Sequence, residues 1–310
     1  MIKRLLLAAM LLVPVAAFAD SSALILTSVA GSPEHEKKFT AWSEGTRAAL
    51  IDKLNFSADR VVTLSGKGAT RDAIQKAFVQ LKGQLKPADA FFLFFIGHGS
   101  YDEAYKFNIT GPDLTAAEYS TLLGTLGPAR IVIVNGTSAS GGAIEALAGK
   151  NRVVVTATKA GGEGNETYFY EYFLDSLLNA EADEDKDKKI SVWEAFKFAN
   201  AAVERFFKEQ GRLATEHSQI SDNGAEPTNA AIKDPPLLAR STSFLVNRPV
   251  TVSDPKLQAM LNEKSELEQK IDALRLNKSA MPEAEYERQM ESLLVELALK
   301  NQQIRAQGTK

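Results

Sequence analysis

The stretch "DAFFLFFIGHGSYD", residues 89–102, decides the fold, because its apolar run stops abruptly at His98, which stands between two glycines. A run without polar alternation is typical of a strand that is buried on both faces of a parallel sheet. The run is too short to cross a bilayer as a helix. We therefore expect a strand that ends just before His98. The role of the histidine then depends on which other residues lie at the same end of the sheet.

Similar apolar runs recur along the chain and alternate with segments of helical periodicity. The alternation predicts an α/β fold of three layers, in which a mainly parallel central sheet lies between helices. Ligand sites in such sheets lie at the carboxyl ends of the strands, where "GHGSYD" and "NGTSASGG" (135–142) follow two of the runs. The other strand-like runs are residues 23–28, 60–65 and 152–158, and the helix-like segments are 36–54, 70–85, 114–126 and 140–149.

Beyond this alternating region, two more helices are expected around an acidic loop, at residues 166–180 and 191–210. A polar stretch that contains proline, from about Thr215 to Ala239, reads as a surface excursion. The apolar segment "STSFLV" (241–246) then has the composition of a last strand.

The first residues have the form of a secretory signal peptide. Basic residues precede an apolar run that ends in Ala17-Phe18-Ala19, the small-x-small pattern of a cleavage site. We expect cleavage after Ala19, removal of residues 1–19, and a periplasmic or secreted protein with no membrane span.

The chain contains no cysteine. In an oxidising compartment the fold must therefore be held by its core without disulfides, and a thiol nucleophile or thiolate metal site is excluded. The hydrophobic content of 45% and the net charge of −3 are typical of a globular protein. Without a basic excess, no nucleic-acid partner is expected.

The composition changes near Asp254, where charged residues become frequent and glycine nearly disappears. Apolar residues at heptad-like spacing predict one helix, and a second begins near Pro282. Three regions result: the signal peptide, a principal domain at residues 20–250, and a helical hairpin at 251–310. The hairpin can fold as an antiparallel coiled coil or mediate self-association through residues 254–306.

The segments "FFIGHGSYD" (94–102) and "IVIVNGTSASGG" (131–142) together resemble the two active-site segments of the caspase–legumain clan of cysteine peptidases. The legumain family is the most similar. There, one strand ends in His-Gly, and the next ends at the catalytic cysteine before a turn rich in serine and glycine. The resemblance spans roughly residues 23–180 and implies a caspase-like fold with a peptide or protein ligand.

The same resemblance places the catalytic histidine at His98, the oxyanion-hole glycine at Gly99 and the cysteine position at Ser138; a slip by one residue would place the last at Thr137. The sequence departs from the family at the nucleophile itself. A serine hydroxyl is far less acidic than a thiol and needs a base close enough to remove its proton. Replacing sulfur by oxygen in a site suited to a thiolate most simply abolishes turnover.

Three interpretations of His98 and Ser138 compete. In the first, Ser138 caps the helix that starts at Ala139, and His98 makes only local hydrogen bonds. In the second, the site binds a peptide without cutting it. In the third, Ser138 is the nucleophile, His98 its base, and Asp102 or Asp113 orients the histidine. We interpret the protein as an exported pseudopeptidase that binds peptides or proteins; an active serine endopeptidase and a purely structural assembly protein are the alternatives.

The stretch "DEDKDKKISVWE" (183–194) matches the spacing of an EF-hand calcium loop. Lys188 departs from it, since glycine usually supplies the sharp turn at that position. We expect a structural Ca²⁺ site, and the alternative is a solvated connector between helices. The ligands would be Asp183, Asp185, Asp187, Lys189 through its carbonyl, Ser191 and Glu194.

Four further residues remain. Glu163 and Glu166 lie in the segment that would line a specificity pocket, where they favour a basic side chain, or are solvated loop charges or acids at a helix N-terminus. His35 and His217 lie in polar stretches without ligand spacing to another histidine, and we interpret both as surface residues.

Overall fold

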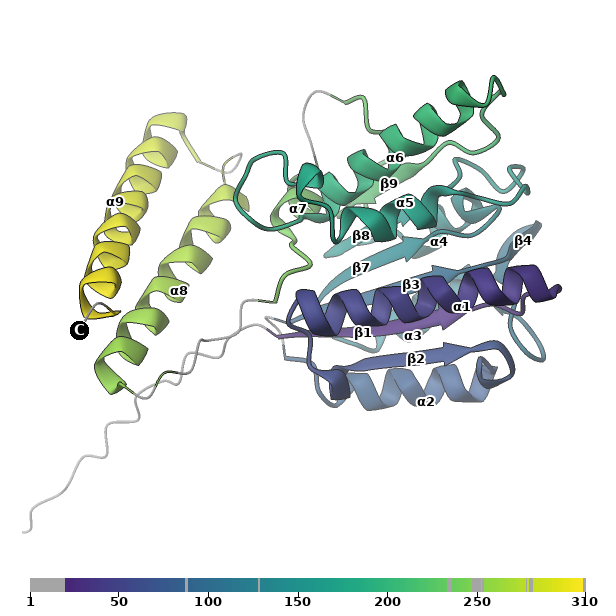
Figure 1. The fold of residues 1–310 in the computed structure, drawn as a ribbon, viewed down its shortest axis with the longest axis horizontal. Helices are drawn as coiled ribbons and strands as arrows, with labels where there is room; N and C mark the ends of the chain where they lie inside the picture. The colour runs from purple at the N-terminus through teal and green to yellow at the C-terminus, as the bar shows by residue number, and fades with distance from the viewer. Residues whose placement is uncertain are drawn as a thin grey trace, which may run out of the picture.

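A six-stranded sheet forms the middle layer of the computed structural model, in the order β2-β1-β3-β7-β8-β9 (Figure 1). All neighbouring strands are parallel except β9, which runs antiparallel to β8. The strands are β1 (Ser21–Thr27), β2 (Val61–Ser65), β3 (Ala90–Ile96), β7 (Arg130–Asn135), β8 (Arg152–Thr156) and β9 (Gln219–Asp222). The structure describes residues 20–86, 89–127, 129–232, 236–246, 252, 254–276, 278 and 281–308, so the expected signal peptide lies outside it.

Helices cover both faces of this sheet, and an apolar cluster lies under each layer. Side chains of β3 alternate between the clusters, with Phe92 and Phe94 in one and Phe91 and Phe95 in the other. A strand in this position has no face toward solvent, which explains the unbroken apolar run. The predicted three-layer α/β fold is confirmed. One layer contains α1 (Pro33–Ala48), α5 (Phe169–Ser176) and α6 (Val192–Glu209); the other contains α2 (Arg71–Lys82), α3 (Ala116–Gly124) and α4 (Ile144–Leu147).

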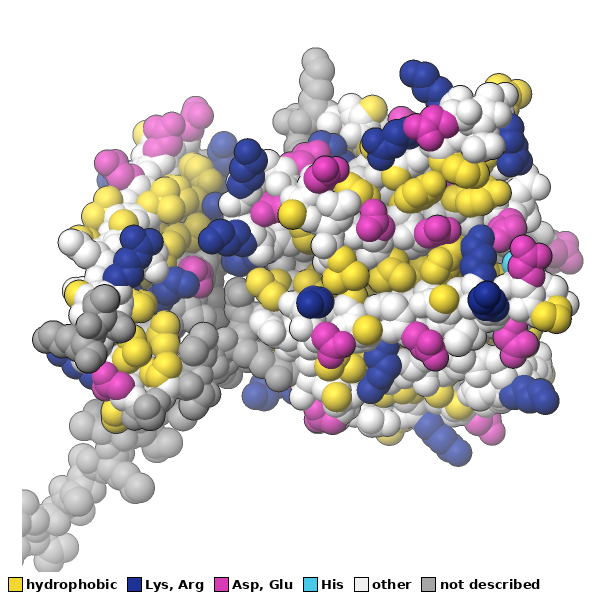
Figure 2. Space-filling view, in the orientation of Figure 1, with side chains coloured by type: hydrophobic (Ala, Val, Ile, Leu, Met, Phe, Trp, Pro, Cys, Tyr) yellow, Lys and Arg dark blue, Asp and Glu magenta, His cyan; other side chains and the backbone are white. Residues whose placement is uncertain are grey.

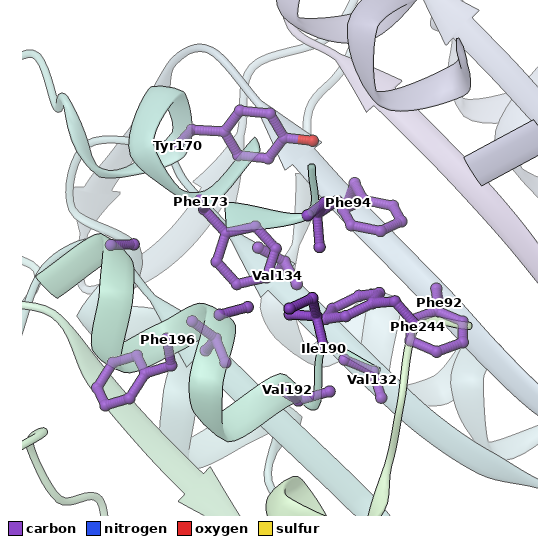
Figure 3. Close-up of a cluster of buried hydrophobic side chains, with 14 of the residues drawn as sticks. Phe92, Phe94, Val132, Val134, Tyr170, Phe173, Ile190, Val192, Phe196 and Phe244 are labelled. Carbon is purple, nitrogen blue, oxygen red and sulfur yellow. The ribbon is translucent and has the colours of Figure 1, made fainter. Parts of the chain in front are cut away.

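The first cluster brings aromatic side chains from distant parts of the chain onto β3 and β7 (Figure 3). Phe173 of α5 and Phe92 of β3 both contact Phe244, with ring centroids 5.8 and 5.1 Å apart. Phe244 is fully buried. The segment after the short helix α7 (Leu237–Ser241) therefore belongs to the core of the principal domain.

The expectation of a last strand at residues 241–246 is wrong. Within this segment Ser243 makes an isolated bridge to Ser191, and Phe244 N donates to the carbonyl of Ile190 at 3.0 Å. The edge strand is β9, inside the stretch expected to be a surface excursion. Its sequence, "QISD", is short and mostly polar, and only its pairing with β8 reveals it.

A small antiparallel sheet was also not expected. It consists of β4 (Gly99–Asp102), β5 (Ala104–Phe107) and β6 (Leu114–Thr115), and it begins directly after His98. Glu103 makes the tight turn between β4 and β5 with φ of 61°. This hairpin places the segment after β3 beside the turn that follows β7.

The C-terminal helices α8 (Pro255–Leu276) and α9 (Glu283–Gly308) pack against each other as the predicted hairpin, which stands beside the sheet (Figure 1). Leu267, Ile271 and Leu274 are buried. Lys300 of α9 forms an ion pair with Glu263 of α8. Among the described residues, no helix combines the length and apolar character needed to span a membrane.

Candidate functional site

The two glycines around His98 are required by close packing at the end of β3. Gly97 has φ of +111°, and a Cβ there would lie 2.2 Å from Ser28 Oγ. A Cβ on Gly99 would lie 2.6 Å from the ring of Tyr105 and 2.7 Å from the carbonyl oxygen of Ser138. All three distances are too short for any larger residue without movement of the surrounding atoms. The glycines therefore hold the His98 backbone in one narrow position.

His98 is half-buried, and its contacts come from the loop between β1 and α1 and from α1 itself. Its backbone N donates to Ser28 Oγ at 2.8 Å, and its ring Nε2 lies 3.2 Å from the carbonyl oxygen of Ala30. Since a carbonyl only accepts, Nε2 carries the proton and Nδ1 is the basic nitrogen of the neutral ring. Burial lowers the pKa of His98, and the nearby charge of His35 lowers it further. The ring is therefore neutral at neutral pH.

His35, interpreted from the sequence as a surface residue, is 30% exposed and also belongs to this site. Its ring meets that of His98 edge-on, with centroids 4.8 Å apart, and stacks on Phe39 at 5.5 Å. Its Nε2 lies 3.6 Å from Glu166 Oε1, which also accepts from Lys38 Nζ at 2.6 Å. Although burial acts in the opposite direction, Lys38 and His35 lower the pKa of Glu166.

Ser138 directs its hydroxyl to the backbone of Gly99. Its Oγ donates to the Gly99 carbonyl at 2.9 Å and accepts from Gly99 N at 3.3 Å. The residue is 6% exposed. These two bonds tie the turn after β7 to the first residue of β4, and they use the hydroxyl proton that a nucleophile would pass to its base.

The interpretation of Ser138 as a helix cap is wrong. The helical segment after β7 is a short 3₁₀ turn at Ser140–Ala143, its cap position is Ala139, and no side chain caps it. Ala139 has φ of 58°, in the left-handed region that a side chain disfavours. Its N donates to the carbonyl of Glu163 at 2.8 Å. Residues held in a strained conformation, such as Ala139 directly after Ser138, cluster at functional sites.

Thr137, the alternative nucleophile position, is fully buried in a polar network. Its Oγ1 lies 2.7 Å from the hydroxyl of Tyr105 and donates to Asn135 Oδ1 at 2.8 Å. Burial raises the pKa of the Tyr105 hydroxyl strongly, so the network is neutral. Thr137 therefore serves to join β5 to β7.

The two proposed orienting residues lie elsewhere. Asp113 Oδ1 accepts from Ile109 N at 2.8 Å and so closes the loop before β6. Asp102 is exposed at the tip of the β4–β5 hairpin, opposite Ala104. In the described part of the chain, neither bonds to the His98 ring.

Tyr101 of β4, a residue not singled out from the sequence, packs against the turn after β7 and the loop after β8. Its ring lies against two glycine backbones: a Cβ on Gly161 would be 2.2 Å from it and one on Gly142 2.4 Å. The side of Tyr101 that does not face the glycines is accessible, since the residue is 48% exposed. An exposed aromatic ring fixed in place is a common element of peptide-binding surfaces.

The carboxylates of the expected pocket segment are paired. Glu163 Oε1 lies 2.6 Å from Nδ1 of His217, and its Oε2 accepts from Lys159 N at 2.9 Å. Glu166 is paired with Lys38, as described above. Both glutamates thus hold the loop after β8 in place. His217 is largely exposed, as expected.

The acidic loop gathers part of the expected metal site. Oxygens of Asp183, Asp185 and Asp187 lie within 4.8 Å of one another, and such oxygens suit a hard cation. Lys188 has φ of 69°, so it adopts the left-handed conformation that glycine usually supplies at this position. The expected helix before the loop is α5, which ends at Ser176, and a 3₁₀ turn, Ala180–Ala182, separates it from the loop.

Ser191 and Glu194 form a capping box at the start of α6. Glu194 Oε2 accepts from Ser191 N at 2.9 Å, and Oε1 accepts from Glu184 N at 3.0 Å. The Glu194 carboxylate therefore faces both the loop and the helix terminus. The expected carbonyl ligand, Lys189, donates its N to Asp187 Oδ1 at 2.8 Å.

Comparison with known proteins finds a matching family model. The model of the Peptidase C13 family matches residues 57–224, more than half of the chain, and the match includes both the turn after β3 and the turn after β7. No curated protein matches the chain. Among solved structures, the crystal structure of protein GSU0716 from Geobacter sulfurreducens is similar, with 17% identity and a TM-score of 0.48; the alignment covers 74% of this chain and all of that one.

Proposed function

The chain belongs to the Peptidase C13 family, the legumain family of the caspase–legumain clan, and because it contains no cysteine we propose that it is an exported pseudopeptidase that binds peptides or proteins. The binding edge would consist of His98, Tyr101 and the loop after β8. Family membership brings a peptidase fold, and the activity itself depends on the groups at the site.

The hydrogen bond from Ser138 Oγ to the Gly99 carbonyl carries this proposal. A serine nucleophile needs a base that takes its proton during attack, and a carbonyl oxygen cannot do so. The protonated nitrogen of His98 faces the carbonyl of Ala30. In this arrangement the serine stabilises the turn and the histidine offers Nδ1 to a ligand.

The first experiment incubates the exported protein with a diverse peptide pool and reads the products by mass spectrometry. We expect no cleavage, and no labelling by a fluorophosphonate. We also expect retention of a subset of peptides, which His98→Ala weakens. Ser100→Ala, which changes an exposed serine on β4, is the matched control for Ser138→Ala. Cleavage that is lost in the Ser138→Ala and His98→Ala variants but kept in Ser100→Ala would establish the serine endopeptidase instead.

A second candidate function is assembly through the C-terminal hairpin. Leu294, Val295 and Leu299 of α9 are about half exposed or more, and apolar side chains gather on the hairpin surface (Figure 2). Exposed apolar patches of this kind often mark association surfaces. Sedimentation of the full chain at increasing concentration tests this, with Leu294→Lys expected to weaken self-association and Leu213→Lys, at an exposed loop leucine, as control.

We also propose that the acidic loop binds Ca²⁺ as a structural brace. Asp183, Asp185 and Asp187 would supply the first ligands, and a bound cation would offset their mutual repulsion beside α6. Equilibrium dialysis should detect retained calcium, and Asp185→Asn should weaken binding by about tenfold or more. Glu181→Gln, just outside the loop, is the control. The proposal fails if the unmodified protein retains no calcium, or if Asp185→Asn retains as much.

A further inference from the structure

The amino end of the sheet holds a buried carboxylate that contacts the backbone nitrogen of Asp20. Asp89, directly before β3, is fully buried. Its Oδ1 accepts from Asp20 N at 2.9 Å, and its Oδ2 accepts from Arg60 Nη1 at 3.1 Å and from Lys86 N at 3.0 Å. The carbonyl of Asp20 accepts from Ala90 N at 3.1 Å. These bonds join the first residues of β1 and β3.

Two carboxylates in this cluster share one guanidinium. Arg60 Nε lies 3.3 Å from Asp20 Oδ2, while Arg60 Nη1 bonds to Asp89. The third nitrogen, Nη2, donates to the carbonyl of Gln84 at 2.8 Å. Arg60 is itself only 13% exposed. The three charged side chains therefore carry one more negative charge than positive. The Asp20 side chain is 30% exposed, whereas Asp89 is fully buried, and a poorly compensated charge is costly at such a buried position.

We propose that the α-amino group of Asp20, formed when residues 1–19 are removed, binds Asp89 as an ammonium and balances this cluster. The proposal rests on the expected cleavage after Ala19. In that hydrolysis, a peptidase of the export machinery adds water across the Ala19–Asp20 bond. Ala19 leaves with the new carboxylate, and Asp20 keeps the nitrogen, which takes up a proton.

The nitrogen concerned already lies 2.9 Å from Asp89 Oδ1. Cleavage thus turns a neutral amide donor into a positive one at the same place, so that attraction between opposite charges is added to the existing hydrogen bond to the carboxylate. Asp20 directly precedes β1, which pairs with both β2 and β3. The stronger bond would therefore stabilise the start of a strand inside the sheet and not at its edge. Removal of residues 1–19 would therefore raise the free energy of unfolding of the exported protein, in addition to its role in export.

The test compares two processed chains. The full precursor is exported by a bacterial host, and its intact mass should show that it begins at Asp20. In the second precursor Ser-Gln is inserted between Ala19 and Asp20, so that the processed chain keeps an amide at Asp20. We expect its Tm to be lower by roughly 3–6 °C. Introducing Asp89→Asn into both chains should reduce the difference to less than about 1 °C.

A second measurement does not depend on the folding of the Asp89→Asn variant. The α-amino group of the normally processed protein should react with an amine-selective acylating reagent about tenfold more slowly than that of the inserted chain, because protonation and contact with Asp89 protect it. A first residue other than Asp20, equal Tm values for the two chains, or equal acylation rates would each overturn the proposal.

Discussion

The two ends of the central sheet hold buried polar groups in different ways. At the amino end, the carboxylate of Asp89 meets the opposite charge of Arg60 at 3.1 Å. At the carboxyl end, Glu216 accepts from the N atoms of Tyr168 and Phe169 at 2.8 and 3.2 Å, and His98 faces a carbonyl. Backbone groups supply no net charge, so burial raises the pKa of Glu216 to about 7 and lowers that of His98. Buried groups whose pKa is shifted in this way are typical of functional sites.

The largest effect should come from breaking the charged pair at the amino end. Asp89→Ala leaves Arg60 partly buried with only Asp20 as its charged partner, and we expect the free energy of unfolding to fall by about 3 kcal/mol or more. Urea denaturation measures this. Glu44→Ala, at an exposed position of α1, should change it by less than about 0.5 kcal/mol. If both variants lost a similar free energy of unfolding, the buried Asp89–Arg60 pair would contribute no more to stability than a single charged side chain at the surface.

The turn after β3 should tolerate almost no added volume. Gly99→Ala places a methyl group 2.6 Å from Tyr105 and 2.7 Å from Ser138, and we expect a loss of about 2–3 kcal/mol. Gly162→Ala is the matched control, because a Cβ there meets nothing within 4 Å. Thermal unfolding of both variants measures the two losses of stability. Equal losses would show that the turn after β3 relaxes around the added methyl group and is not rigid.

Glu216 should make stability depend on pH. Its pKa is raised to about 7 in the folded protein, against an ordinary value near 4.5, so the folded state keeps the proton longer. The free energy of unfolding should therefore fall as pH rises from about 4.5 to about 7, by on the order of 2 kcal/mol from this group, and then level off. Glu216→Gln should flatten that slope in urea melts at pH 5, 6 and 7. An unchanged slope would assign the dependence to other groups.

The smallest effect concerns the two histidines. Since the charge of His35 helps to lower the pKa of His98, His35→Gln should raise that pKa toward its ordinary value, while burial keeps it below. An NMR titration of the imidazole signals measures the shift. His217→Gln, at the histidine paired with Glu163, should leave the His98 titration unchanged. Equal shifts in both variants would show that the His35 ring does not act on His98 specifically.

Much of the fold could be predicted because an unbroken apolar run allows few environments. Phe91 to Ile96 must be covered on both sides, and this requires helices on both faces of the sheet. The edge strand β9 was not predicted, because its sequence, "QISD", contains one apolar residue, Ile220, and so lacks a strand pattern. An edge strand pairs with a neighbour on one side only, and here Ile220 alone contributes a hydrophobic side chain to the core. Phe244 was assigned to a strand for its apolar neighbours, although its burial comes from contact with Phe92 and Phe173.

The candidate site was predicted in part. Local motifs located His98, Gly99 and Ser138, because a strand that ends in a glycine-rich turn is visible in a few consecutive residues. The partners of these residues were not predictable in the same way. His35 reaches His98 because α1 packs over the end of β3, and no spacing in the sequence expresses that contact.

By itself the sequence determined the three-layer class, the absence of a thiol nucleophile, the hairpin of helices at the C-terminus and the spacing of the acidic loop. Each follows from composition or periodicity, which act locally along the chain. Only the tertiary structure decided that Ser138 bonds to Gly99, that His35 meets His98, and that Asp20 meets Asp89. These depend on which distant segments the core brings together, since a buried polar group takes the partner that packing places within hydrogen-bond distance.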